Sequence, residues 1–387
     1  MTANLDERDP AAPDPRYTIG RTSAWVGWAP VVVAIGALAI LVWLGRDMAF
    51  YHDEYALLLL RDLSPQGVLA PHNEHLIATV VILYRTLLAT VGTVSYWPYL
   101  GVTFALHVIV AGIVYVVVRR ETTAAWALGA MAVMLLLGSG GDDILWAFQS
   151  AVIGATAAGM AAVVVAPRWP ALAGVLLTVG LATSGAALAF LVGTALHLLL
   201  TRPRALPWLA LPVGLYLAWY VTFGVTGIVA LRSPSLDGVP EYVLAGLVAS
   251  AAGVMGSVLP VVGSMALLAL AFGIGWARGL APTVLALLAS SVAFFFIAGL
   301  VRAQLGPEQA AASRYVYVGA PGLLIAGAVV LARMERPWRD IVGVAVLTIA
   351  LAGNVVLLVE SHDRLVSKID CERTMTPIAR GSAGNPC

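Results

Sequence analysis

The stretch AWVGWAPVVVAIGALAILVWLG at residues 24–45 contains no charged residue. A helix needs about 20 apolar residues to cross the hydrocarbon core of a bilayer, so this stretch predicts a transmembrane helix. The whole chain is similar in character: 60% of its 387 residues are hydrophobic and 11% are charged, whereas a soluble domain carries roughly 25% charged residues. The sequence therefore predicts an all-α, polytopic integral membrane protein. Its net charge of +1 gives no electrostatic basis for binding nucleic acid.

Further apolar segments recur along the chain, and arginines mark the turns between them. These segments are 76–92, 97–118, 123–138, 149–166, 171–182, 186–200, 207–228, 241–258, 260–277, 281–301, 315–332 and 340–359. The basic turns hold Arg119, Arg120, Arg168, Arg202, Arg204, Arg278, Arg333, Arg336 and Arg339. Because cytoplasmic loops collect arginine, we place these turns and the N-terminus inside, which predicts about eleven crossings with the C-terminus outside. The chain changes sides at each crossing. All of these basic turns can lie inside only if 76–92, with Arg85 in its middle, and 241–258 do not cross.

Two of the apolar segments, 171–182 and 186–200, are short for a crossing. The tripeptide TSG at Thr183–Gly185 would be the break between two helices. The alternative is one long, tilted helix through the whole region.

Three regions follow from this layout. Residues 1–23 are polar and Pro-rich, which predicts a disordered cytoplasmic tail and no cleavable signal peptide. Residues 24–359 form the membrane domain, and 360–387 an extracytoplasmic C-terminal tail. We expect a multi-pass protein of the plasma membrane, the inner membrane of a bacterium. In an oxidising space Cys371 and Cys387 would form a disulfide; otherwise they are free thiols.

The first outer loop begins with FYHDEY, in which His52, Asp53 and Glu54 follow the first span. Successive helical side chains point about 100° apart, so only one of the two acids can face a given substrate. A carboxylate at the membrane surface is partly desolvated, and its pKa can rise toward the range of a general base, with His52 tuning it or binding phosphate. The alternative is the solvated start of a helix, where acids are favoured.

A second polar cluster, PHNEH at 71–75, lies later in the same loop. His72 and His75 would share one face of a helix. With His52, Asp53 and Glu74 they could hold a divalent metal ion, although the spacing is not that of a zinc protease. Polar contacts from His72, Asn73, Glu74 and His75 to a sugar or phosphate are the second interpretation. A simple interfacial cap is the third.

The second outer loop reads GSGGDDILWAFQ at 138–149. Carboxylates such as Asp142 and Asp143 hydrogen-bond sugar hydroxyls, and the aromatic ring of Trp146 or Phe148 can stack on a sugar face. Gln149 completes this candidate binding segment. The alternative is that Asp143 caps the next helix.

Two arginines form a further group of candidate site residues. Arg302 ends one span on the outside, and Arg314 and Tyr315 begin the next. Guanidinium groups bind phosphate through paired hydrogen bonds, which suits a phosphate ester. Snorkelling to lipid headgroups is the alternative.

Taken together, the acidic pair after the first span, the interfacial helix, the second acidic motif and the SRY start of a late span resemble the GT-C superfamily of membrane glycosyltransferases. Its protein-mannosyltransferase and aminoarabinose-transferase branches use polyprenyl-phosphate-linked sugars. The resemblance covers residues 24–359. The chain departs from the family in being short, in lacking a sizeable soluble domain after the spans, and in carrying HNEH where some relatives have Pro-Pro-Leu.

The resemblance implies a role for each matching residue. Asp53 would be the catalytic acid that deprotonates the acceptor hydroxyl for inverting attack, with Glu54 its neighbour in the motif. Asp142 or Asp143 would match the second acidic motif. Arg314, with Arg302, would bind the leaving lipid phosphate, and Tyr315 would help to orient it. The partners implied are a polyprenyl-phosphate sugar, a glycan, lipid or protein acceptor, and membrane lipids.

The chemistry needs no nucleotide site, because a lipid-phosphate sugar is already activated, and no glycine-rich phosphate loop occurs. A transporter is the main competing function, but transporters place ionisable groups near the bilayer midplane. Here the spans hold only His107 and His197 as candidates, and either could be a hydrogen-bonded packing residue. A non-catalytic membrane protein is a further possibility. So is a polymerase- or ligase-type transferase, but that type usually depends on a large late outer loop, whereas 302–314 is small.

Overall fold

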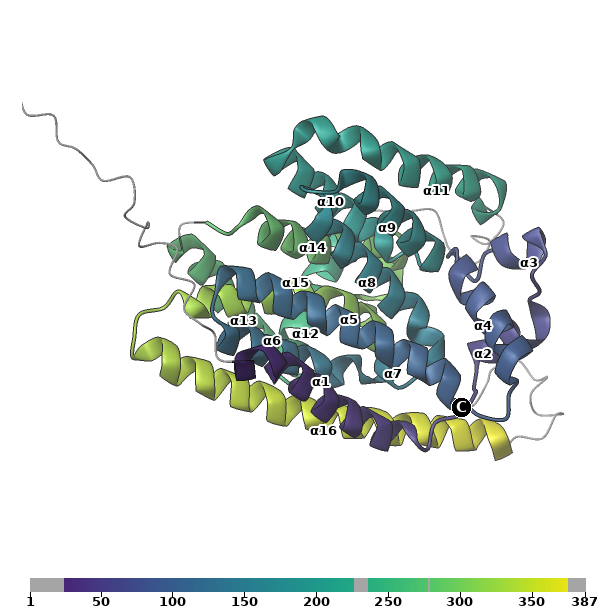
Figure 1. Cartoon of the computed structure of the whole chain (residues 1–387), viewed down its shortest axis with the longest axis horizontal. Coiled ribbons are helices and arrows are strands. Elements are labelled where there is room, and N and C mark those ends of the chain that lie inside the picture. The colour runs from purple at the N-terminus through teal and green to yellow at the C-terminus, as the bar shows by residue number, and fades with distance from the viewer. Residues whose placement is uncertain (1–23, 226–235, 278, 375–387) are drawn as a thin grey trace, which may run out of the picture.

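The computed structural model describes residues 24–225, 236–277 and 279–374, and these are helical throughout apart from connecting turns and one isolated bridge (Figure 1). The helices are α1 (Ala24–Gly45), α2 (Asp53–Tyr55), α3 (Pro65–Leu69), α4 (Ala78–Val91), α5 (Trp97–Glu121), α6 (Ala124–Leu135), α7 (Gly141–Ile144), α8 (Ser150–Val165), α9 (Pro170–Thr183), α10 (Ala187–Thr201), α11 (Ala210–Thr222), α12 (Val239–Val254), α13 (Pro260–Trp276), α14 (Pro282–Arg302), α15 (Ser313–Ala332) and α16 (Trp338–Thr374). The predicted all-α class is confirmed. The predicted tail at 1–23 lies outside the described residues.

Membrane character follows from helix length and composition. In the described part of the chain, eight helical stretches are long and apolar enough to cross a bilayer, and shorter apolar helices lie between them. Large hydrophobic side chains are exposed on α1, α11, α13 and α16, as expected for helices that face lipid. A multi-pass membrane protein is therefore plausible from the structure as well as from the sequence. The count of about eleven crossings and the orientation stay predictions.

Two local predictions can be compared with the helices directly. The region around Thr183–Gly185 does break the chain: α9 ends at Thr183, Ser184 is extended, and α10 begins at Ala187. The alternative of one long helix is therefore wrong. The segment 76–92 forms the short helix α4, and its Arg85 donates a hydrogen bond to the carbonyl of Leu58 in the first loop.

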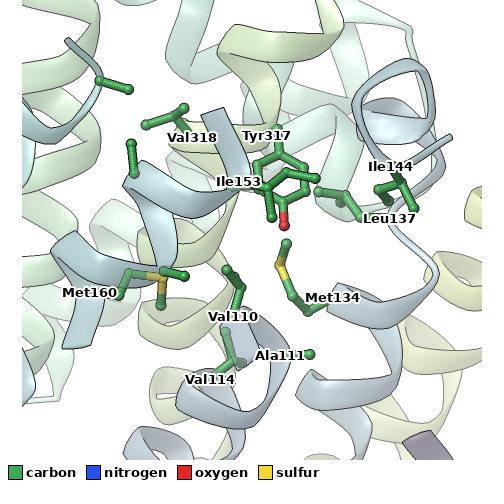
Figure 2. Packing of buried hydrophobic residues seen from close by; sticks show 14 of the residues in the cluster. Val110, Ala111, Val114, Met134, Leu137, Ile144, Ile153, Met160, Tyr317 and Val318 are labelled. Carbon is green, nitrogen blue, oxygen red and sulfur yellow. The ribbon is translucent and has the colours of Figure 1, made fainter. Parts of the chain in front are cut away.

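The core lies where α5, α6, α8 and α15 meet (Figure 2). Tyr317 of α15 is fully buried there, and its hydroxyl lies 2.7 Å from Nδ1 of His107. The other ring nitrogen of His107 lies 3.1 Å from the carbonyl of Leu135. His197 is likewise bonded, through Nδ1, to the carbonyl of Val163 at 2.7 Å. Both histidines inside the predicted spans are thus hydrogen-bonded packing residues.

The last helix runs much further than the sequence predicted. α16 has 37 residues, about 55 Å of helix at 1.5 Å per residue, whereas the hydrocarbon core is about 30 Å thick. Residues 360–374, which the sequence assigned to the C-terminal tail, continue this helix, and Leu365 and Ile369 are buried in it. Cys371 is disulfide-bonded; Cys387, the second cysteine of the predicted pair, lies outside the described residues.

Candidate functional site

Three connecting segments meet at one end of the helix bundle, which we call the polar end. They are the first loop (residues 46–77), the second loop (136–149) and the late loop (303–312). Their contacts are direct: the ring of Tyr51 packs on that of Trp146 at 4.8 Å between centroids, and Arg302, the residue that precedes the late loop, forms an ion pair with Glu74. The polar end therefore brings together the acidic and basic motifs singled out in the sequence.

The two adjacent acids of the first loop point in different directions. They lie in the single turn of α2, where successive side chains diverge by about 100°. The Glu54 residue has 0% of its surface exposed, whereas 30% of the Asp53 side chain is exposed. Asp53 is therefore the acid that can meet a substrate, and Glu54 is part of the interior.

Glu54 is held in a cage of tyrosines. Its Oε1 accepts hydrogen bonds from the hydroxyls of Tyr84 at 2.6 Å and Tyr96 at 3.1 Å, and its Oε2 accepts one from the backbone N–H of Tyr51 at 3.0 Å. The hydroxyl of Tyr96 also accepts from the backbone N–H of Ala147, at 2.8 Å. Burial raises the pKa of Glu54 to about 7, although the hydrogen bonds act in the opposite direction. Glu54 thus joins the first loop to α4 and to the second loop.

Two histidines lie beside Asp53. Its Oδ1 lies 3.5 Å from Nε2 of His72 and 3.9 Å from Nε2 of His52. Burial raises the pKa of Asp53, but hydrogen bonding and charge from His72, with the charges of His52 and Arg314, lower it more, so the pKa ends below its ordinary value. The expected upward shift is therefore wrong. Asp53 is an ionised carboxylate at neutral pH, able to accept a proton.

The PHNEH segment does not form a helix. Its backbone makes a tight turn in which His72 and His75 exchange hydrogen bonds of 2.9 and 3.0 Å, and Asn73 between them has a φ of 53°. The expected shared helix face is therefore wrong. His72 turns toward Asp53, while His75 packs against Gly185, where a Cβ atom would come within 2.8 Å of its Nδ1.

A divalent metal site does not emerge from these residues. Among the residues that the structure describes, no group of three or more His, Cys, Asp or Glu side chains is placed to hold a metal ion. The set proposed from the sequence is split by the turn at 72–75, because Glu74 is engaged with Arg302 rather than with the histidine–aspartate pair.

The basic side of the site is built from the ends of α14 and α15. The guanidinium carbons of Arg302 and Arg314 lie 5.9 and 5.2 Å from the ring centre of Tyr315, at favourable cation–π distances. Arg302 is neutralised by Glu74. Arg314 is exposed, and in the described part of the chain no carboxylate lies within ion-pair distance of it. Its charge still acts on Asp53, so Arg314 is the arginine better placed to receive an anion.

The two acids of the second loop also diverge. Asp143, 1% exposed, accepts a hydrogen bond of 2.7 Å from the hydroxyl of Ser313 at the start of α15. It caps no helix, so the capping interpretation is wrong. Asp142 instead pairs with Arg364 of α16 at 3.0 Å. Asp143 therefore fixes the second loop to the helix that carries Arg314.

The aromatic residues of the second loop are packing residues. Trp146 and Phe148 are buried, with ring centroids 5.2 Å apart, and Phe148 also packs on His72 at 5.3 Å. Gln149 is buried beside them. Neither Trp146 nor Phe148 therefore has an open ring face on which a sugar could stack. These rings instead pack against the first loop on either side of Asp53, at Tyr51 and His72.

An apolar groove begins next to the polar end. It has a volume of about 340 Å³ and is lined mainly by alanine, glycine, valine and leucine residues of α4, α5, α8 and α9. Thr79 and Thr183 line it and are joined by a hydrogen bond of 2.8 Å. Thr183 is two residues from Gly185, which touches His75. The groove therefore comes close in sequence to the residue that packs against His75.

Sequence reasoning missed several residues of the site. Tyr84 and Tyr96 gave no signal, because a tyrosine near a membrane surface is common. Arg364, which pairs with Asp142, and Glu372, which accepts a hydrogen bond from the N–H of His52, lie in the segment interpreted as a tail. Leu358 of the last predicted span is followed at helical spacing by Leu365 and Ile369 of that segment, a pattern that could have revealed that α16 continues.

Comparison of the chain with protein-family models, with curated proteins and with solved structures gave no match. Function is therefore inferred from the residues and their arrangement.

Proposed function

We propose that this protein is a membrane glycosyltransferase that moves a sugar from a polyprenyl-phosphate donor to a glycan, lipid or protein acceptor. One observation carries the proposal: the polar end holds a partly exposed carboxylate, Asp53, and an exposed guanidinium, Arg314, whose charge lowers the pKa of Asp53, and an apolar groove lies among the helices nearby. Acid, cation and groove are the three parts that this chemistry requires.

Asp53 is the proposed base. Its carboxylate accepts the proton of the acceptor hydroxyl while the acceptor oxygen bonds to the anomeric carbon of the sugar. The bond from that carbon to the phosphate oxygen breaks on the opposite face, so the configuration inverts. His72, 3.5 Å from Asp53, holds the carboxylate in place. The low pKa of Asp53 keeps it in the form that can accept a proton.

Arg314 is the proposed phosphate ligand. The donor releases a polyprenyl phosphate, on which negative charge increases as the bond breaks, and a guanidinium stabilises that charge. Arg314 is exposed, and its guanidinium carbon lies 5.2 Å from the ring centre of Tyr315. Arg302 has a lesser role because Glu74 already neutralises it.

The groove is the proposed site for the first part of the lipid chain. Its lining is apolar and it lies among α4, α5, α8 and α9, where a chain can enter from the bilayer. Because the basic turns at 119–120, 168, 202–204 and 333–339 lie at the opposite ends of the helices, we place the polar end on the extracytoplasmic face of the plasma membrane. The acceptor would then arrive from the aqueous side.

The test uses the purified full-length chain in liposomes, with a panel of synthetic isoprenyl-phosphate hexoses and pentoses, and measures release of isoprenyl phosphate and the anomeric configuration of the product. We expect one donor to react with inversion, and Asp53→Asn to lower the rate by roughly a hundredfold or more. The control is Asp62→Asn, an exposed acid in the same loop, which should leave the rate unchanged.

Transfer by Asp53→Asn at the wild-type rate would remove the assigned base. If no donor reacts and the liposomes instead accumulate a solute, the protein is a transporter.

A further inference from the structure

The end of α16 lies against the candidate site instead of extending into solvent. Figure 1 shows the yellow end of this helix at the same end of the molecule as α2. The hydroxyl of Ser361 donates to the carbonyl of Gly138 at 3.3 Å, and Arg364 pairs with Asp142 at 3.0 Å. Gly141 allows this close approach, since a Cβ atom there would lie 2.6 Å from the side chain of Ser361.

Further along the same helix, Glu372 reaches the first loop. Its Oε2 accepts a hydrogen bond of 3.1 Å from the backbone N–H of His52, and its Oε1 lies 3.6 Å from Nδ1 of the same residue. One carboxylate therefore contacts both the main chain and the ring of the residue that precedes Asp53.

The main chain of His52 needs such a partner. Its φ of 54° and ψ of −120° lie in a region that residues with a side chain seldom adopt. His52 is also the residue from which α2 starts, so its backbone angles set the direction of Asp53. A relaxation at His52 would swing the carboxylate of Asp53 away from His72, which lies 3.5 Å from it.

We propose that Glu372 is a positioning residue: it holds His52 in its positive-φ conformation and thereby aims Asp53. The end of α16 is thus one wall of the site. The role of Asp53 in the reaction rests on the proposed function; the restraint on His52 does not.

The first experiment measures amide hydrogen exchange and carbodiimide labelling of Asp53 by mass spectrometry, on the full-length chain in detergent. In Glu372→Ala we expect the segment 50–56 to exchange roughly tenfold faster, because a hydrogen bond to a charged group is lost. Asp53 should also be labelled faster. Glu372→Gln keeps an acceptor oxygen and should stay near the wild type. The matched control is Asp370→Ala, whose side chain is 62% exposed on the same helix. Unchanged exchange in Glu372→Ala, or equal acceleration in the control, overturns the proposal.

The second experiment repeats the sugar-transfer assay with the same variants. Glu372→Ala should lower kcat roughly ten- to a hundredfold with little change in the KM of the donor, since misplacing the base affects the chemical step. Glu372→Gln should recover most of the rate. Faster exchange without any loss of kcat would overturn the positioning role. If the wild type transfers no sugar, the proposed function fails, and exchange and labelling alone decide whether Glu372 holds Asp53.

Discussion

Replacing Glu54 by glutamine should change how the stability of this protein depends on pH. Glu54 is buried among the hydroxyls of Tyr84 and Tyr96 and the N–H of Tyr51. Glutamine has nearly the same shape but does not titrate in this range. The comparison therefore isolates the ionisation of one buried carboxyl group.

The sign and size follow from the pKa. Burial raises the pKa of Glu54 from 4.5 to about 7, so the folded protein binds a proton that the unfolded chain has already released. Stability is lost as the pH rises through that window, and the loss is complete above the folded pKa. One pKa unit corresponds to about 1.4 kcal/mol. The ionised carboxylate thus lowers the free energy of unfolding by about 3 kcal/mol at pH values above the window.

The assay is reversible unfolding of both proteins in the same detergent, at steps from about pH 4.5 to about pH 7.5. The difference in unfolding free energy, glutamine variant minus wild type, should rise by about 3 kcal/mol across the range, because contributions of the remaining titrating groups cancel. A difference that stays constant with pH would show that Glu54 does not titrate in a buried cage.

Two further predictions concern the arginine and glycine positions. Arg314→Ala should raise the KM of the lipid-phosphate donor roughly tenfold or more while the KM of the acceptor and the Tm stay nearly unchanged, because Arg314 is exposed; steady-state kinetics check this, and equal losses for donor and acceptor would contradict a phosphate role. Gly138→Ala should lower the unfolding free energy by about 1–3 kcal/mol, because its Cβ would overlap the backbone of α16 at Asn354. Gly101→Ala, with open space around its Cβ, is the control and should be neutral or stabilising in the same thermal unfolding measurement.

The helical fold class and the membrane character of this protein could be predicted from the sequence alone. Hydrophobicity is a sum over neighbouring residues, so long apolar runs identify helices for a bilayer without knowledge of their partners. The divergence of Asp53 and Glu54 was also predictable, because it follows from the angle between successive helical residues. The break near Ser184 followed from local backbone preferences in the same way.

Which of the two adjacent acids faces inward could not be predicted. The helical angle says only that they differ; the tyrosines that enclose Glu54 come from α4 and from the turn before α5. The predicted direction of the pKa shift of Asp53 was wrong for the same reason. Desolvation was foreseen from its place near a membrane, but the opposing hydrogen bond and charge of His72 depend on a turn that reverses the chain at Asn73.

The sequence by itself determined that this is an all-helical protein with a membrane character, and that its polar residues form a few short groups. Only the tertiary structure decided how those groups combine: Arg302 with Glu74, Asp143 with Ser313, and Glu372 with His52. The reason is that a helix forms from interactions between residues three or four apart, whereas these pairs join residues that are distant in the chain. Their contact depends on how the long helices pack, and in particular on the extension of α16 back over the first loop.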